Sequence, residues 1–136
     1  MSSPELSRNI VILACAISAG IHGALVPTHF EDGAGPGLGF VAATVLLAAL
    51  VVTLTVRPTT ALAPAGATAV FAGLLVSYAL ATTTGLPLLH PDPEPVEGLA
   101  LVTKAVEVVG LLAALQLLGG RRAAVAPFRQ PKGTWT

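Results

Sequence analysis

The stretch LGFVAATVLLAALVVTLTV, residues 38–56, contains no charged side chain. It is long enough to cross the hydrocarbon core of a bilayer as a helix, which takes roughly 20 apolar residues. Three more stretches have similar length and apolar character, at residues 9–26, 65–84 and 99–118. These four segments leave almost no chain for a soluble domain, so we expect residues 1–136 to form a single membrane domain.

The composition supports the same interpretation. Of the 136 residues, 54% are hydrophobic and 10% are charged, whereas soluble domains carry about 25% charged residues. The few basic residues form no stripe with interleaved aromatic side chains, so nucleic acid is not an expected partner. The sequence predicts an all-α integral membrane protein, a four-helix bundle whose surrounding partner is the lipid bilayer.

Proline and glycine suggest where the spans end. Proline disfavours helical geometry in the residue before it, so span one is expected to end before Pro27 and span two at Arg57-Pro58. Gly119-Gly120 is expected to stop span four. The connection 58–64 is short, which makes spans two and three antiparallel neighbours. We therefore expect an up-down-up-down bundle.

The distribution of charge predicts the orientation. All basic residues except Lys104 fall on one side of the predicted spans: Arg8, Arg57, Arg121, Arg122, Arg129 and Lys132. Short loops rich in Lys and Arg stay in the cytoplasm. The opposite side receives acidic residues: Glu31, Asp32, Asp92, Glu94 and Glu97. We expect a protein of the cell membrane with both termini in the cytoplasm, where the basic tail 119–136 lies against the inner leaflet.

Three ionisable residues lie inside predicted spans, where such residues are costly and usually face the bundle interior. They are His22, Lys104 and Glu107. At 1.5 Å per residue, His22 lies ~6 Å and Glu107 ~12 Å below the outer ends of their spans. Lys104 and Glu107 are three residues apart, which permits an ion pair on one helix face. Either the pair serves only to specify packing, or Glu107 carries a proton or ligates a cation.

Span one also carries a polar stripe. Cys15, Ser18 and His22 recur at steps of three and four residues and so share a helix face. Tyr78 of span three is expected at a similar depth. Several polar side chains should therefore gather beneath the outer mouth of the bundle.

A metal site is one interpretation of the outer side. His29, His90, Glu31 and Asp92 lie in the predicted outer connections, with His22 below them. Imidazole and carboxylate ligands suit transition metals such as Cu or Zn. The spacing matches no known close metal-ligand motif. The alternative is a solvated acidic rim that helps to enforce the orientation.

The predicted function follows from small-residue helix faces and from the lack of catalytic motifs. Ala16, Gly20 and Ala24 share one face of span one, as do Gly73, Ser77 and Ala81 on span three. Such faces let membrane helices approach closely, either to other subunits or in self-association. No phosphate-binding loop or nucleophile elbow is present. The first hypothesis is an accessory or structural subunit of a larger membrane complex, with no catalytic activity of its own. The alternative is a binding or transport protein with an outward-facing histidine and carboxylate site for a transition metal or protons.

Overall fold

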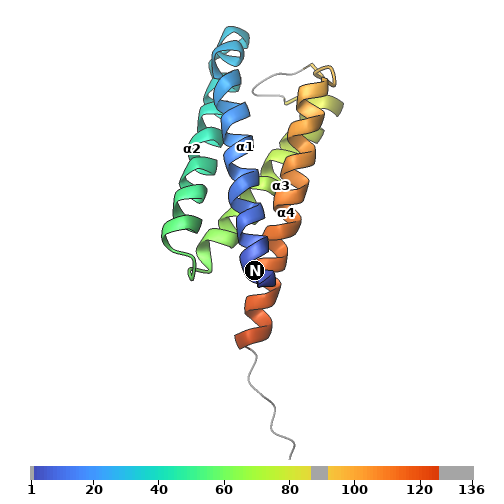
Figure 1. Cartoon of the computed structure of the whole chain (residues 1–136). Helices are drawn as coiled ribbons and strands as arrows, with labels where there is room; N and C mark the ends of the chain where they lie inside the picture. The colour runs from blue at the N-terminus through green and yellow to red at the C-terminus, as the bar shows by residue number, and fades with distance from the viewer. Residues whose placement is uncertain (1, 87–91, 126–136) are drawn as a thin grey trace, which may run out of the picture.

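The computed structural model describes residues 2–86 and 92–125, with side chains up to residue 120, and Figure 1 shows the helices lying side by side. Consecutive helices run in opposite directions along the bundle. The described ranges contain four helices: α1 (Ser3–Asp32), α2 (Ala34–Val56), α3 (Leu62–Thr83) and α4 (Gly98–Val125). All four are long and apolar enough to cross a membrane. The predicted all-helical fold is confirmed for the described residues, whereas membrane insertion, topology and orientation stay predictions.

The helix α1 does not end before Pro27, as the sequence suggested, but continues to Asp32. A proline inside a helix removes one backbone hydrogen bond, and here the turns on both sides of it remain helical. The chain reverses at Gly33, whose φ of 147° and ψ of 163° belong to a region that essentially only glycine adopts. A single residue therefore joins α1 to α2, and the hairpin is longer than expected.

Two other helix ends differ from the expectation. Pro64 is the third residue of α3, not a residue before it, and a proline is tolerated there because first-turn amides have no partner within the helix. The prediction that Gly119-Gly120 stops the last helix is wrong, since α4 continues to Val125. Glycine costs about 1 kcal/mol in a helix, which disfavours the helix without breaking it. The predicted basic tail beyond Val125 lies outside the described residues.

The bundle core is formed by all four helices around small side chains. Gly110 of α4 is packed closely against two other helices: a Cβ built there would lie 2.5 Å from the ring of Phe71 and 2.9 Å from Ala14. Phe71 on α3 is fully buried. Three helices thus meet at a position that only glycine fits, and the candidate site lies next to it along α1 and α4.

Candidate functional site

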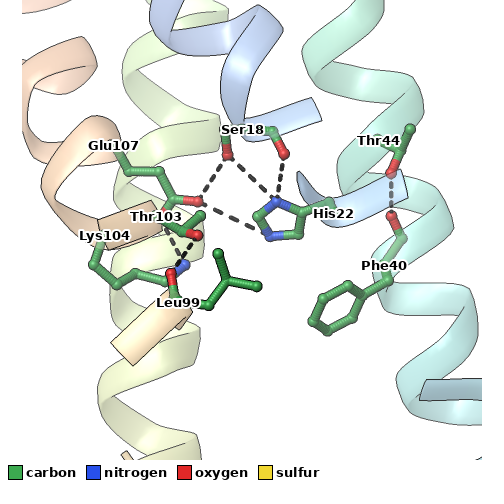
Figure 2. A network of polar contacts seen from close by, with 8 residues as sticks. All are labelled: Ser18, His22, Phe40, Thr44, Leu99, Thr103, Lys104 and Glu107. Atoms are coloured by element: carbon green, nitrogen blue, oxygen red, sulfur yellow. Dashed lines mark hydrogen bonds and ion pairs between the residues drawn. The ribbon is translucent and has the colours of Figure 1, made fainter. Parts of the chain in front are cut away.

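Glu107 of α4 is the largest charged side chain in the core and is completely buried. Its Oε2 accepts a hydrogen bond of 2.6 Å from Nζ of Lys104, one turn earlier on the same helix. Its Oε1 accepts a hydrogen bond of 2.9 Å from Oγ of Ser18 on α1. Figure 2 shows these contacts joining α1 to α4. Both oxygens of the buried carboxylate therefore have a donor.

The geometry of His22 fixes which ring nitrogen carries its proton. Nδ1 lies 2.8 Å from the backbone oxygen of Ser18, four residues earlier. A carbonyl oxygen only accepts, so Nδ1 must be the donor. In the neutral ring Nε2 then has a lone pair and no proton. This unprotonated nitrogen faces Glu107, with 3.9 Å between Nε2 and Oε1.

The pair formed by His22 and Glu107 thus brings two proton acceptors close together in the core. His22 is 6% exposed and Glu107 is 0% exposed. With Nε2 unprotonated and Glu107 ionised, two electron-rich atoms face each other at a distance too long for a direct hydrogen bond. One added proton on Nε2 would change this repulsion into attraction. The pair has the chemistry of a site for a single proton.

Aromatic rings flank this polar network on two sides. The Lys104 ammonium lies 5.3 Å from the centroid of the Tyr78 ring on α3, a distance typical of a cation–π contact. The Tyr78 hydroxyl is buried and has no hydrogen-bond partner among the described residues. On the other side the ring of Phe40, from α2, lies 5.1 Å from that of His22. Side chains from all four helices therefore contribute to the site or its walls.

His29 lies nearer the α1–α2 connection and does not contact Glu107 in the described structure. Its Nδ1 donates to the backbone oxygen of Leu25 over 2.9 Å, which is the same hydrogen-bond arrangement as in His22. Its ring stacks on Phe40 with 3.5 Å between centroids and 21° between planes. The two histidines of α1 thus share Phe40 as a neighbour.

The predicted metal site is not assembled within the described residues. Residues 2–86 and 92–125 contain no group of three or more His, Cys, Asp or Glu side chains that could hold a metal ion. Glu31 and Asp92 are both described, whereas His90 lies outside the described residues. The transition-metal site therefore stays a prediction that depends on His90.

The network lies deeper in the bundle than the sequence indicated. Because α1 extends to Asp32, His22 lies ten residues before its end, roughly 15 Å along the axis. Glu107 lies nine residues after the start of α4, roughly 14 Å along that helix. The two residues are therefore level with each other, each about a third of the way along its helix from the α1–α2 end.

Two features of the site were missed in the sequence. The hydrogen bond from Ser18 to Glu107 depends on how α1 and α4 align, which no local pattern specifies. Phe40 was not singled out, because a phenylalanine in an apolar span is expected to be a core or lipid-facing residue. The position of Phe40 beside the histidines of α1 can be inferred only once Gly33 is known to join the two helices directly.

Comparison of the chain with protein-family models, curated proteins and solved structures finds no match.

Proposed function

We propose that this chain is a membrane protein that binds a proton between His22 and Glu107 and passes it on within the bilayer. The observation that carries the proposal is that Nε2 of His22, the proton acceptor of the neutral ring, faces the buried Glu107 carboxylate at 3.9 Å. With Glu107 ionised, Lys104 protonated and His22 neutral, the formal charges of the site sum to zero. A bound proton adds one positive charge between the two acceptors.

Transfer between the two acceptors of this site needs only groups that the chain supplies. A proton enters on Nε2 of His22 and makes the ring an imidazolium. It then moves to Oε1 of Glu107, which leaves a neutral imidazole and a neutral carboxylic acid. Lys104 loses its anionic partner at that moment, since Oε2 is part of the same carboxyl. The position of the Lys104 ammonium is thereby coupled to the protonation of Glu107.

A proton suits the site better than a transition metal does. Lys104 Nζ is 2.6 Å from one carboxylate oxygen, and the Ser18 hydroxyl is 2.9 Å from the other. A metal ion bound there would displace both donors and sit beside an ammonium group. A proton needs neither change. We therefore favour proton binding over the transition-metal alternative for this network.

Proton flux into liposomes tests the proposal. The full chain is reconstituted around a trapped pH-sensitive dye, a potassium diffusion potential drives protons inward, and Glu107→Gln is compared with the unmodified protein. Glu97→Gln is the matched control, because Glu97 is an exposed glutamate directly before α4, the helix that carries Glu107. We expect flux above empty liposomes that is lost in Glu107→Gln and kept in Glu97→Gln. Equal flux in all three proteins, or none above empty liposomes, would overturn the proposal.

A role as an accessory subunit is the second candidate, and one observation favours it. Ala16, Gly20 and Ala24 of α1 are all exposed on the outside of the bundle. A Cβ at Gly20 would meet no atom within 4 Å, and the same holds for Gly73 on α3. Small residues that the bundle itself does not use are available for close packing with another membrane helix.

Crosslinking tests this second role. A photoreactive residue in place of Ala16 should trap a heterologous membrane protein in native membranes, whereas one in place of Leu46, an exposed residue of α2, should not. Recovery of uncrosslinked chain from both positions would argue against the subunit role.

A further inference from the structure

Two histidine side chains of α1 lie one above the other, with the same hydrogen-bond arrangement. His22 and His29 are seven residues apart, which is two turns or roughly 10 Å along the helix. Each Nδ1 donates to the carbonyl oxygen four residues earlier, over 2.8 Å and 2.9 Å respectively. Each neutral ring therefore keeps Nε2 as its proton acceptor. His29 is three residues from the end of α1, and His22 is in the core.

Phe40 occupies the level between these histidines. Gly37 lies against Phe30, and Gly23 lies against Thr44, which defines how the antiparallel helices α1 and α2 align. In this alignment Phe40 faces the part of α1 between His22 and His29. Its ring centroid is 5.1 Å from that of His22 and 3.5 Å from that of His29. A phenyl ring has no group that accepts a proton, so it interrupts the line from His29 to His22.

In the opposite direction along α1, toward its N-terminus, the network adjoins tightly packed apolar residues. Ala14 lies one turn from Ser18 toward the N-terminus of α1 and is 4% exposed. Ala14 lies against Gly110 of α4. A single methyl group added at Gly110 would overlap both Ala14 and Phe71 of α3. The residues directly beneath the network therefore offer no proton-accepting side chain. The buried site therefore exchanges its proton with solvent more readily at the α1–α2 end of the bundle.

The other titratable groups around His22 do not offer a comparable relay to that end. From α4 the site receives Glu107 and Lys104, and from α3 Tyr78 lies against Lys104. The helix α2 contains no titratable side chain at all. On α1 itself Cys15 is fully buried in the apolar core, whereas Glu5 and Arg8 lie near the N-terminus of the helix and Glu31 and Asp32 at its C-terminal end. His29 is the titratable group that lies next to Phe40.

We infer that the buried site exchanges its proton with the α1–α2 end of the bundle through His29, and that Phe40 is the barrier which this exchange crosses. The inference rests on the proposed function, because it concerns access to the same site. Proton transfer from His29 to His22 takes place when the Phe40 ring moves aside. The ring thus controls the rate of exchange without binding the proton.

Flux in the reconstituted full chain tests the route with three variants. His29→Gln keeps a side-chain donor for the Leu25 carbonyl and removes the titratable group. We expect its flux to fall by about 100-fold, the lower end of what a positioned proton-transfer group contributes. Phe40→Ala opens the barrier and should raise flux severalfold. Leu46→Ala is the control, because Leu46 is a 52% exposed apolar side chain on the same helix as Phe40, and its flux should not change.

A second measurement separates failure of the route from failure of the site or loss of the fold. Nitrogen-15 NMR of histidine-labelled protein reports whether Nε2 of His22 still takes up a proton in each variant. If His29→Gln and Phe40→Ala both keep normal flux while Glu107→Gln abolishes it, the route is wrong and the site stands. A loss of flux in Tyr78→Phe with His29→Gln unaffected would also overturn the route, because exchange would then pass along α3. If the unmodified protein gives no flux that depends on Glu107, the proposed function itself fails.

Discussion

Ser18 of α1 and Glu107 of α4 are joined by a hydrogen bond of 2.9 Å in which both side chains are 0% exposed. The bond positions the carboxylate against His22, because the backbone oxygen of the same serine holds Nδ1 of that ring. One residue of α1 thereby orients both proton acceptors of the site. Replacing the Ser18 side chain should therefore change both the free energy of unfolding and the proton affinity of the site.

Replacing Ser18 tests its contribution to stability. Ser18→Ala leaves Oε1 of a buried carboxylate without its donor, and hydrogen bonds to charged groups contribute about 1.5 to 3 kcal/mol. We expect the free energy of unfolding to fall by about that amount in mixed micelles titrated with SDS. Ser77→Ala serves as the control, since Ser77 is exposed on α3. Equal stability of the two variants would show that the bond to Glu107 contributes nothing.

The ion pair gives a second prediction. Lys104→Met leaves the fully buried Glu107 without its counter-ion, and breaking a buried pair costs about 3 to 5 kcal/mol. The double variant Lys104→Met/Glu107→Gln removes both charges and should regain most of that stability. The same SDS titration measures all four members of the cycle. A double variant as unstable as Lys104→Met would mean that the lysine acts through packing alone.

Close packing at Gly110 gives a third prediction. Alanine gains about 1 kcal/mol of helix propensity over glycine. At Gly110 the added Cβ would overlap Phe71, which is buried, and overpacking costs about 1 to 3 kcal/mol. Gly110→Ala should therefore be net destabilising or neutral. Gly20→Ala is expected to stabilise, because its Cβ meets no atom. The melting temperatures of the two variants in detergent should differ in that order, and the reverse order would contradict the packing of three helices at Gly110.

Orientation in the membrane gives a fourth prediction. Asp32→Cys and Ala61→Cys place exposed thiols at the two opposite ends of the bundle. Cys15 is buried and should not react. With both termini cytoplasmic, a membrane-impermeant maleimide should label Asp32→Cys on intact cells and Ala61→Cys only after the membrane is opened. The opposite pattern would reverse the orientation that the basic residues predict.

The sequence predicts the four helices well because helix formation in lipid depends on local apolar length. It also indicates Lys104 and Glu107 as neighbours, since the spacing along one helix is fixed by the helix itself. Helix ends at Pro27 and Gly119 could not be predicted reliably. Proline and glycine lower the stability of a helix by amounts that packing and neighbouring turns can offset.

The assembly of the site could be predicted only in part. The polar stripe containing Ser18 and His22 is visible in the sequence, but its partner on α4 depends on the alignment of two helices far apart in the chain. Phe40 reaches both histidines because Gly33 reverses the chain in a single residue. That conformation is available to glycine, but a glycine alone does not indicate that it is adopted.

The protonation state of Nε2 of His22 tests the central claim most directly. Nitrogen-15 NMR of the reconstituted, histidine-labelled chain can follow this atom as the pH is lowered, with His22→Gln identifying its signal. We predict a ring protonated on Nδ1 alone at high pH, then a single proton uptake on Nε2 that shifts to lower pH in Glu107→Gln and is unchanged in Glu97→Gln. A His22 ring already protonated on Nε2 at high pH, or an identical titration in Glu107→Gln, would contradict the account.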